Sequence, residues 1–233
     1  MLWLSGSFLA GAIPFAVIIG RARGIDLRQH GSGNPGATNL GRAAGKKWGI
    51  LCFVLDVGKG LLPVLAFALA WKHLLPPGMV VGERGEVYSP TTPLVLSSAW
   101  IVFQWVLVAV AAVLGHVFSP FLRFRGGKGV ATGLGATLGL FPVVTVPAFL
   151  AFVLWYAVCK LTGYVGLASA AAAASLPVFT VLSGLVLGRT PGEIAVFVGL
   201  TGILGAFVVA RHWGNLTRIR RGTEPKAAWT GKA

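Results

Sequence analysis

Long apolar runs recur along this chain, and they are the feature that most restricts its fold. Residues 130–159 alone form a run of 30 residues without a charged side chain. A helix needs about 20 mostly apolar residues to cross the hydrocarbon core of a bilayer. Charged residues make up 11% of the 233-residue chain, against about 25% in a typical soluble domain. The chain is therefore a membrane protein, and soluble, disordered and disulfide-stabilised folds are excluded.

The apolar segments set the expected number of helices. As one helix, the run 130–159 would be about 45 Å long, well beyond a core of about 30 Å. Pro142 and Pro147 interrupt it, so we predict two short helices with a tight turn near 141–144. The other predicted membrane helices cover residues 2–20, 48–71, 96–118, 164–187 and 194–210.

The expected fold is an all-α polytopic membrane protein with seven transmembrane helices in a single domain, 1–233, with a short cytoplasmic tail at 225–233. No charged residue precedes the apolar run 2–20, so we expect a retained helix rather than a cleaved signal peptide. The outer loop, about 72–93, is polar and contains prolines, and the sequence assigns it no chemistry.

The net charge of +14 indicates the orientation. With the amino terminus outside, seven crossings leave the carboxyl terminus in the cytoplasm. Lys72, Arg84 and Arg189 then lie outside and Lys59 lies within a helix. The remaining 16 of the 20 basic residues lie on the cytoplasmic side, in agreement with the positive-inside rule. These are Arg21, Arg23, Arg28, Arg42, Lys46, Lys47, Arg123, Arg125, Lys128, Lys160, Arg211, Arg218, Arg220, Arg221, Lys226 and Lys232.

A first polar stretch, HGSGNPGATNLGR, occupies residues 30–42 on that side. Its glycines permit positive φ and close backbone approach, so successive N–H groups suit an anion-binding nest, with Arg42 adding a charge. A flexible loop between two helices would have a similar composition. This stretch alone leaves both interpretations open.

A second stretch, GHVFSPFLRFRGGKGVAT, occupies residues 115–132. Its Gly-Gly-Lys-Gly turn leads directly into a helix, whose first N–H groups and dipole favour phosphate, and Lys128 adds a positive charge. The spacing differs from G-x-x-x-x-G-K-[ST], so nucleotide binding is not indicated. The alternative is a basic turn that only sets topology, and the three glycines around Lys128 argue against it.

A third stretch, RHWGNLTRIRRGTE at residues 211–224, follows the last helix. If that helix continues for one turn, His212 and Asn215 face the same way at i, i+3. A lone histidine at a membrane edge is usually an interfacial residue. Near two anion-binding loops, His212 becomes a candidate proton donor or base.

The other polar residues in the apolar runs have structural interpretations. Asp56 and Lys59 lie at i, i+3 on the second helix, where an ion pair between them explains both. Cys52 and Cys159 lack metal-ligand spacing and are predicted to be packing residues. The chain has two Asp, no HExxH, no Gly-x-Ser-x-Gly and no His-x4-Asp pair. We therefore expect no metal site, and we expect no nucleic-acid partner.

Together the three stretches resemble the integral-membrane acyl-phosphate:glycerol-3-phosphate 1-O-acyltransferases of bacterial phospholipid synthesis. That family's motif GSGNxGATNxxR matches residues 31–42 at every fixed position. Its motifs GGKGVAT and RHxxNxxRxxxGxE match 126–132 and 211–224, and an Asp-x-x-Lys-Gly matches 56–60. Any one motif is weak evidence, but three in this order across most of the chain are specific.

The resemblance implies a monomeric seven-helix enzyme of the bacterial cytoplasmic (inner) membrane, with its active site on the cytoplasmic face. Such an enzyme transfers a fatty acyl group from acyl phosphate to the 1-hydroxyl of sn-glycerol 3-phosphate, without a cofactor, metal, acyl-CoA or acyl carrier protein. The products are lysophosphatidic acid and inorganic phosphate. The catalytic residues assigned on this basis are Ser32, Asn34, Arg42, Lys128, His212 and Asn215. The substrate-binding residues are Gly31, Gly33, Gly36, Thr38, Asn39, Arg125, Gly126, Gly127, Gly129, Arg211 and Glu224.

One position departs from the family. Where the family commonly has Tyr-x-Ser-Leu-x-Ser, residues 164–169 read Tyr-Val-Gly-Leu-Ala-Ser, so Gly166 replaces the first serine. A phosphate contact from that hydroxyl is therefore lost, or is supplied by the backbone or by Ser169. The outer loop is also longer than is usual in the family.

The expected mechanism is direct acyl transfer, and two candidates remain for the base. One is His212; the other is a substrate phosphate oxygen, which the resemblance favours. A covalent Ser32 intermediate lacks an adjacent base within its own motif. Two other functional classes use similar basic faces: transporters of organic phosphates, whose sites lie at broken helices near the midplane, and non-catalytic lipid-headgroup binders.

Overall fold

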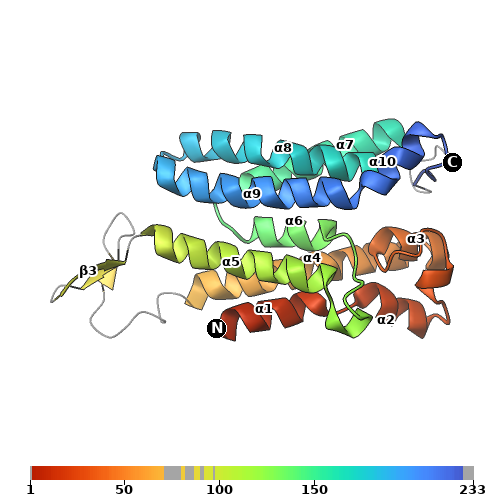
Figure 1. Ribbon diagram of the computed structural model, residues 1–233, viewed down its shortest axis with the longest axis horizontal. Coiled ribbons are helices and arrows are strands. Elements are labelled where there is room, and N and C mark those ends of the chain that lie inside the picture. The colour runs from red at the N-terminus through yellow and green to blue at the C-terminus, as the bar shows by residue number, and fades with distance from the viewer. Residues whose placement is uncertain (1, 71–79, 82–86, 90–91, 97, 228–233) are drawn as a thin grey trace.

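The computed structural model describes residues 2–70, 80, 81, 87–89, 92–96 and 98–227, which form an elongated helical bundle (Figure 1). The predicted apolar segments are helical, so this part of the assignment is confirmed. The α-helices are α1 (Leu2–Ala12), α2 (Phe15–Ala22), α3 (Ala37–Ala44), α4 (Lys46–Ala70), α5 (Ser98–Val117), α6 (Val130–Leu138), α7 (Thr145–Thr162), α8 (Val165–Val186), α9 (Pro191–Arg211) and α10 (Trp213–Arg220). The short 3₁₀ helices are η1 (Leu27–Gln29) and η3 (Pro120–Leu122).

The first predicted helix is interrupted between α1 and α2. Pro14 lies at the break, where proline has no N–H to donate and its ring clashes with the preceding turn. The Lys59 ammonium group from α4 donates a 2.7 Å hydrogen bond to the Ile13 carbonyl oxygen at the same break. The interruption therefore places a carbonyl group that is outside the regular helical bonding within reach of a buried charge.

The run 130–159 contains two helices, as predicted, and the chain turns between Leu138 and Thr145. However, α6 has nine residues and is about 14 Å long, which is short of one hydrocarbon core. Within the described residues, six helical segments are long and apolar enough to cross a membrane: Leu2–Ala22, Lys46–Ala70, Val102–Leu122, Thr145–Thr162, Val165–Val186 and Pro191–Arg211. Helix length therefore does not confirm the predicted seven crossings.

Helix α6 lies in the middle of the bundle, between α4 and α5 on one side and α7 to α9 on the other (Figure 1). Glycines allow its close contact with α4. A methyl group at Gly60 would overlap the Thr132 carbonyl oxygen, and one at Gly135 would overlap that of Val57. Small residues at such crossings let helix backbones approach closely. This packing fixes the height of α6, and hence of its N-terminus, in the bundle.

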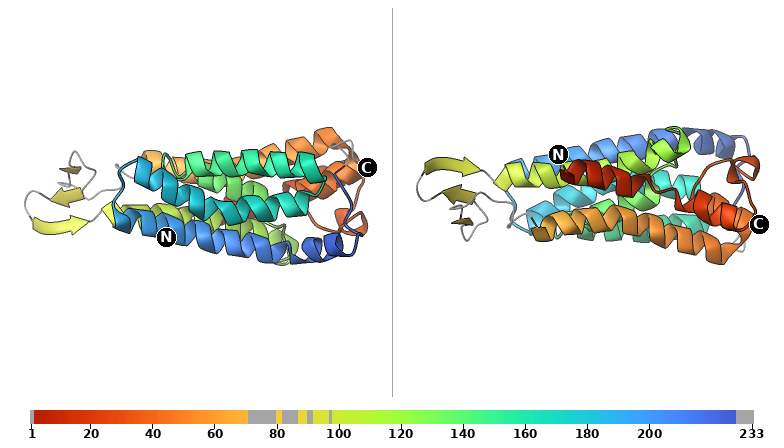
Figure 2. Two further views of the ribbon diagram at one scale, coloured as in Figure 1. Left: turned by 90° about the horizontal axis from the view of Figure 1, so that it is seen from above. Right: turned by 90° about the horizontal axis from the view of Figure 1, so that it is seen from below.

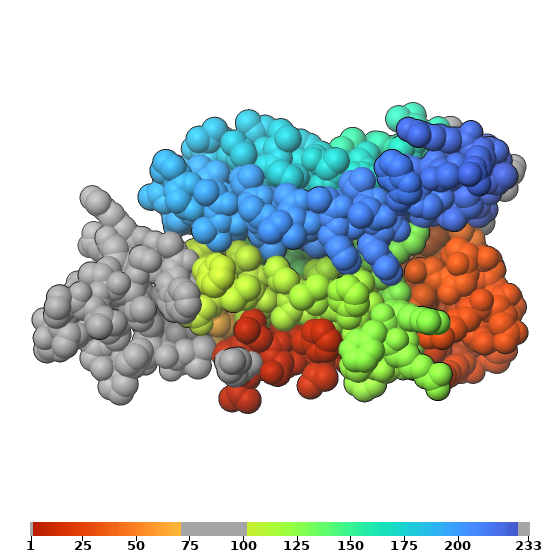
Figure 3. All heavy atoms as spheres, in the orientation of Figure 1, coloured from red at the N-terminus to blue at the C-terminus, as the bar shows by residue number. Residues whose placement is uncertain are grey.

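The three polar stretches gather at one end of the bundle, and a small sheet lies at the other (Figures 1 and 2). In the space-filling view, atoms of the first stretch and α3, in orange, lie beside those of α10, in blue, at that end (Figure 3). The predicted outer loop falls partly outside the described residues. Its described part forms antiparallel strands in the order β1–β2–β3, which the all-α expectation did not include. These are β1 (Val80–Val81), β2 (Val87–Ser89) and β3 (Thr92–Leu96), rich in β-branched residues that favour strands.

The apolar side chains divide between a core and an outer surface. Val64, Phe67 and Leu140 belong to a buried cluster around α4, α5, α6 and α9. Leu185 and Ile203 instead lie exposed on α8 and α9. Exposed leucines and isoleucines along membrane-length helices suit contact with lipid.

Candidate active site

A polar cavity of about 100 Å³ lies where the three polar stretches meet. Residues from all three stretches line it, so the three stretches lie around one shared space. The predicted site residues that line it are Asn34, Gly36, Thr38, Lys128, Gly129 and His212. The other lining residues are Ala37, Phe53, Asp56, His116, Val130, Ala131, Trp155, Val165 and Ser169.

The loop before α3, residues 30–36, is held by one buried side chain, that of Asn39. The Asn39 amide nitrogen donates 3.0 Å hydrogen bonds to the Leu27 and His30 carbonyl oxygens. Its amide oxygen accepts one of 3.1 Å from the Ser32 backbone N–H. Gly31 has φ +55 and faces the Asn39 oxygen, which leaves no space for a side chain. We call residues 30–36 the α3 loop.

The N-terminus of α3 borders the cavity. Gly36 is its N-cap and makes no side-chain hydrogen bond to the helix, because glycine has no side chain. Gly36, Ala37 and Thr38 all line the cavity. The first N–H groups of a helix have no partner within the helix and carry its positive dipole end. This end of α3 can therefore donate to an anion in the cavity.

The loop before α6, residues 126–129, is held by backbone packing against the end of α5. The Gly126 N–H donates to the Val117 carbonyl oxygen at 2.9 Å. A methyl group at Gly127 would overlap the His116 imidazole, so this approach requires glycine. Gly129, at φ +83, is the N-cap of α6, and Val130 begins the helix as predicted. We call residues 126–129 the α6 loop; it brings a second helix N-terminus to the same cavity.

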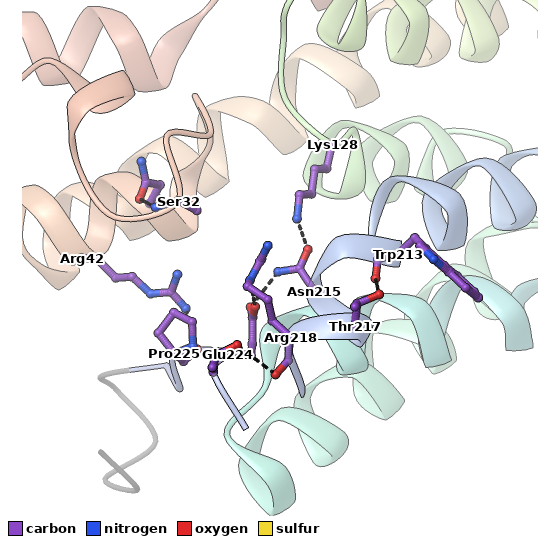
Figure 4. A network of polar contacts seen from close by, with 11 residues as sticks. Ser32, Arg42, Lys128, Trp213, Asn215, Thr217, Arg218, Glu224 and Pro225 are labelled. Carbon is purple, nitrogen blue, oxygen red and sulfur yellow. Dashed lines mark hydrogen bonds and ion pairs between the residues drawn. The ribbon is translucent and has the colours of Figure 1, made fainter. Parts of the chain in front are cut away.

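Lys128 belongs to a chain of polar contacts (Figure 4). Its ammonium group donates a short hydrogen bond to the Asn215 amide oxygen. The Asn215 amide nitrogen donates to Glu224 at 2.6 Å, and Arg218 pairs with the other Glu224 oxygen at 2.7 Å. Burial lowers the pKa of Lys128 to about 8; the Glu224 carboxylate opposes this shift, and nearby arginines add to it. The cation is therefore poorly solvated and suited to an anionic ligand.

His212 is buried between α9 and α10 and lines the cavity. Its Nδ1 lies 2.8 Å from the Val208 carbonyl oxygen. A carbonyl group only accepts, so Nδ1 carries the proton and Nε2 is left as the acceptor of the neutral ring. Burial lowers the pKa of His212 to about 4, and the Lys128 charge contributes. The imidazole is therefore neutral near pH 7.

Several predicted site residues do not line the cavity. Ser32 is exposed and its backbone is tied to Asn39. Arg125 is exposed. Arg211 donates to the Gly127 carbonyl oxygen at 3.2 Å, which supports the α6 loop from outside. Arg42 donates to the Pro225 carbonyl oxygen, and Glu224 accepts from Asn215 and Arg218. The other predicted residues outside the lining are Asn215, Asn39, Gly31, Gly33, Gly126 and Gly127.

Among the cavity residues that the sequence did not assign to the site, two are titratable: Asp56 and His116. Asp56 does pair with Lys59, at 2.7 Å, as predicted. The His116 Nδ1 lies 3.9 Å from the same Asp56 oxygen. The available signal for His116 was the second stretch itself, since the Gly127 that packs against the His116 ring belongs to the same stretch. Within the described residues, no three His, Cys, Asp or Glu side chains gather closely enough to hold a metal ion.

An apolar groove adjoins the polar cavity. It has a volume of about 70 Å³ and runs between α6, α7, α8 and α9, with Leu134, Ala173 and Leu204 among its lining residues. Its boundary with the cavity is shared by Phe53, Gly129, Val130, Trp155 and Ser169. A group with a charged head and an apolar chain could occupy both spaces at once.

The family model for glycerol-3-phosphate acyltransferases matches residues 1–222. The chain belongs to this acyltransferase family. A glycerol-3-phosphate acyltransferase of Trichlorobacter lovleyi is 39% identical over 226 residues, which cover 97% of this chain and 96% of that protein. One of Thermosynechococcus vestitus is 37% identical, covering 94% and 91%.

Two solved structures are also similar to this acyltransferase. Both are of PlsY (YgiH), an integral membrane glycerol 3-phosphate acyltransferase. Its glycerol 3-phosphate form shares 31% identity, with a TM-score of 0.72 and coverage of 97% of this chain and 94% of that chain. Its lysophosphatidic acid form shares 30% identity, with a TM-score of 0.71 and coverage of 97% and 93%.

Gly166, where this acyltransferase departs from the family pattern, packs against the polar contact chain. A Cβ atom there would lie 2.6 Å from the Asn215 Cβ and 3.2 Å from its amide nitrogen. The absent side chain therefore gives Asn215 the room that it occupies between Lys128 and Glu224.

Proposed function

We propose that this enzyme transfers a fatty acyl group from acyl phosphate to the 1-hydroxyl of sn-glycerol 3-phosphate, releasing lysophosphatidic acid and inorganic phosphate. One observation carries the proposal: two helix N-termini and Lys128 border a single cavity that continues into an apolar groove. Both substrates are phosphorylated, and one has an acyl chain. The pair thus needs both kinds of space side by side.

The phosphate groups would bind between the two helix N-termini. The N-terminal N–H groups of α3 and α6 approach the cavity from different sides and favour a negative charge there. Lys128 adds a cation that burial has partly stripped of water. Donors fixed in this way stabilise the charge that moves onto the leaving phosphate.

The acyl chain would lie in the apolar groove. Ala172 and Ala173 of α8 line this groove. The stacked rings of Phe53, Phe152 and Trp155 form its side near the cavity. Apolar walls here favour a chain by removing its surface from water.

In the chemical step, the glycerol hydroxyl oxygen attacks the acyl carbonyl carbon and the bond from that carbon to the phosphate oxygen breaks. The hydroxyl proton must move to a base. A histidine with a pKa of about 4 is a weak base, whereas a phosphate monoester has a second pKa of about 6. We therefore assign the proton of the attacking hydroxyl to a phosphate oxygen. His212 would orient glycerol 3-phosphate instead, with Nε2 accepting a hydrogen bond from the 2-hydroxyl group.

The enzyme would act as a monomer in the bacterial cytoplasmic membrane, as a single domain, with its site facing the cytoplasm. The seventh crossing would be made by α6 together with the turn at 139–144. This count puts the amino terminus outside and 16 of the 20 basic residues inside.

The test uses the purified protein with palmitoyl phosphate and glycerol 3-phosphate. We expect inorganic phosphate and lysophosphatidic acid in equal amounts, and no product when palmitoyl-CoA replaces palmitoyl phosphate. Product from palmitoyl-CoA alone, or none from either donor, would overturn the proposal. Turnover would also separate an enzyme from a transporter or a lipid-headgroup binder.

A further inference from the structure

The chain continues past residue 222, where the family match ends, and folds back onto the bundle. Gly222, at φ +70, follows the C-cap of α10, and the Thr223 N–H donates to the Arg218 carbonyl oxygen at 2.9 Å. These contacts reverse the chain direction. We call residues 223–227 the C-terminal strap. The sequence analysis treated residues from 225 onward as a tail.

The C-terminal strap is fixed at its two ends. Near its start, the Glu224 carboxylate accepts hydrogen bonds from Asn215 and Arg218. At its end, the Ala227 N–H donates to the Gly163 carbonyl oxygen at 2.8 Å, in the turn between α7 and α8. The Ala227 side chain is 2% exposed and packs with Cys159. A segment held at both ends keeps its middle in place.

The middle of the C-terminal strap holds Arg42, which comes from α3. An Arg42 guanidinium nitrogen, Nη2, donates a 3.0 Å hydrogen bond to the Pro225 carbonyl oxygen. In the part of the chain that the structure describes, Arg42 Nε is a buried nitrogen without a hydrogen-bond partner. A buried cationic donor left unpaired is costly unless a ligand completes it. Arg42 also lies near enough for its charge to act on Lys128.

We propose that the C-terminal strap is a positioning element of the active site, which holds the Arg42 guanidinium in the orientation that receives an anionic substrate. Pro225 acts through its backbone carbonyl, and Ala227 acts as the anchor. A flexible arginine side chain loses conformational entropy when it binds a ligand. A hydrogen bond to a fixed carbonyl group orders the side chain before binding, so less entropy is lost in the binding step. This inference rests on the proposed function.

Two variants test the C-terminal strap: one deletes most of it, and the other disturbs its anchor. A chain ended at Glu224 lacks the Pro225 carbonyl and the anchor. Ala227→Trp keeps the full chain but places a large ring at a position that is 2% exposed. The matched control is a chain ended at Thr230, which keeps residues 223–227.

The measurement is kcat and KM for both substrates, with Arg42 intact and in Arg42→Ala. With Arg42 intact, we expect both strap variants to lose about tenfold in kcat/KM, the size expected for a hydrogen bond to a charged group. In Arg42→Ala the same changes should cost less than about twofold, because effects that act through one residue are not additive. The chain ended at Thr230 should stay within about twofold of the full chain.

Two results would overturn the inference. One is no loss in either strap variant. The other is an equal loss with and without Arg42, which would indicate a purely structural segment. If the full chain forms no product, the proposed function fails instead, and binding of inorganic phosphate by the same proteins then tests the C-terminal strap. Weaker binding only where Arg42 is present would support it, and equal binding throughout would overturn it.

Discussion

The α3 loop and the α6 loop bring the same device, a helix N-terminus, to one cavity, but they are held in different ways. Three hydrogen bonds from a single side chain, Asn39, fix the α3 loop. The α6 loop is fixed by backbone contact of Gly126 and Gly127 with the end of α5. A side-chain clamp fails when its polar group is removed, whereas a backbone contact fails when any atom is added.

The loops also differ in charge. The α6 loop carries Lys128 itself, next to the first turn of its helix. The sequence of the α3 loop from residue 31 to 36 holds no charged residue, and its cation, Arg42, comes from the next turns of α3. The α6 loop should therefore contribute more of the charge stabilisation, and the α3 loop more of the shape.

We expect the largest effect from replacing Lys128, which tests whether the α6 loop supplies the charge stabilisation. Lys128→Ala should lower kcat/KM by about 10²–10³-fold, as does the loss of a donor aimed at developing charge. The matched control is Lys46→Ala, at the exposed start of α4, which should change kcat/KM less than about twofold. Equal losses in the two variants would mean that Lys128 serves only topology.

Gly127→Ala should have the next largest effect. The added methyl group overlaps the His116 ring, so the α6 loop or the ring, both at the cavity, must shift. We expect a loss of about 100-fold in kcat/KM, since small misplacements of catalytic groups have costs of this size. Gly58→Ala is the control, because a Cβ atom there meets nothing within 4 Å. An active Gly127→Ala would show that the contact with His116 does not position the loop.

Asn39→Ala removes the clamp of the α3 loop. We expect kcat/KM to fall by about 10- to 50-fold, because three backbone groups lose their side-chain partner. Gln29→Ala removes an amide from an exposed neighbour and should be near neutral. If Asn39→Ala were as damaging as Lys128→Ala, the distinction between shape and charge would fail.

The pH profile probes the charge of the α6 loop directly. The pKa of Lys128 is lowered to about 8, so the ammonium form prevails below that pH and is lost above it. kcat/KM should therefore fall by roughly fivefold between pH 8 and 9. Lys128→Arg should move this decline to higher pH, because arginine stays protonated. A decline unchanged in Lys128→Arg would assign it to another group.

The smallest effect is expected at Gly166. A serine there would press on Asn215, at 2.6 Å from Cβ to Cβ. We expect Gly166→Ser to reduce kcat/KM by about threefold to tenfold, through displacement of a hydrogen-bonded side chain. Gly199→Ser, at a glycine with open space around it, is the control. Increased activity in Gly166→Ser would show that the family's serine fits this site.

The membrane helices were predictable from the sequence, and so was the gathering of the three polar stretches at one end of the bundle. Apolar runs and basic loops are local signals. The start of α6 after Gly129 follows from the Gly-Gly-Lys-Gly turn, and the Asp56–Lys59 pair follows from helical spacing. Helix α3 was not predicted, since a polar segment rich in Gly, Asn and Thr has weak helix propensity by itself.

Long-range contacts account for what the sequence did not predict. His116 becomes a cavity residue because Gly127 packs against its ring. Arg42 reaches Pro225 across 183 positions of the chain. No periodicity or spacing encodes such a contact, because it depends on how α3 and the end of the chain are brought together by the whole bundle.

A structure of the protein with bound glycerol 3-phosphate is the most direct test that the two loops form one phosphate site. We predict the phosphate group in the polar cavity, within hydrogen-bond distance of Lys128 Nζ and of N–H groups at the start of α3 or α6. A phosphate bound only by the basic side chains of α10, with the polar cavity empty, would contradict this.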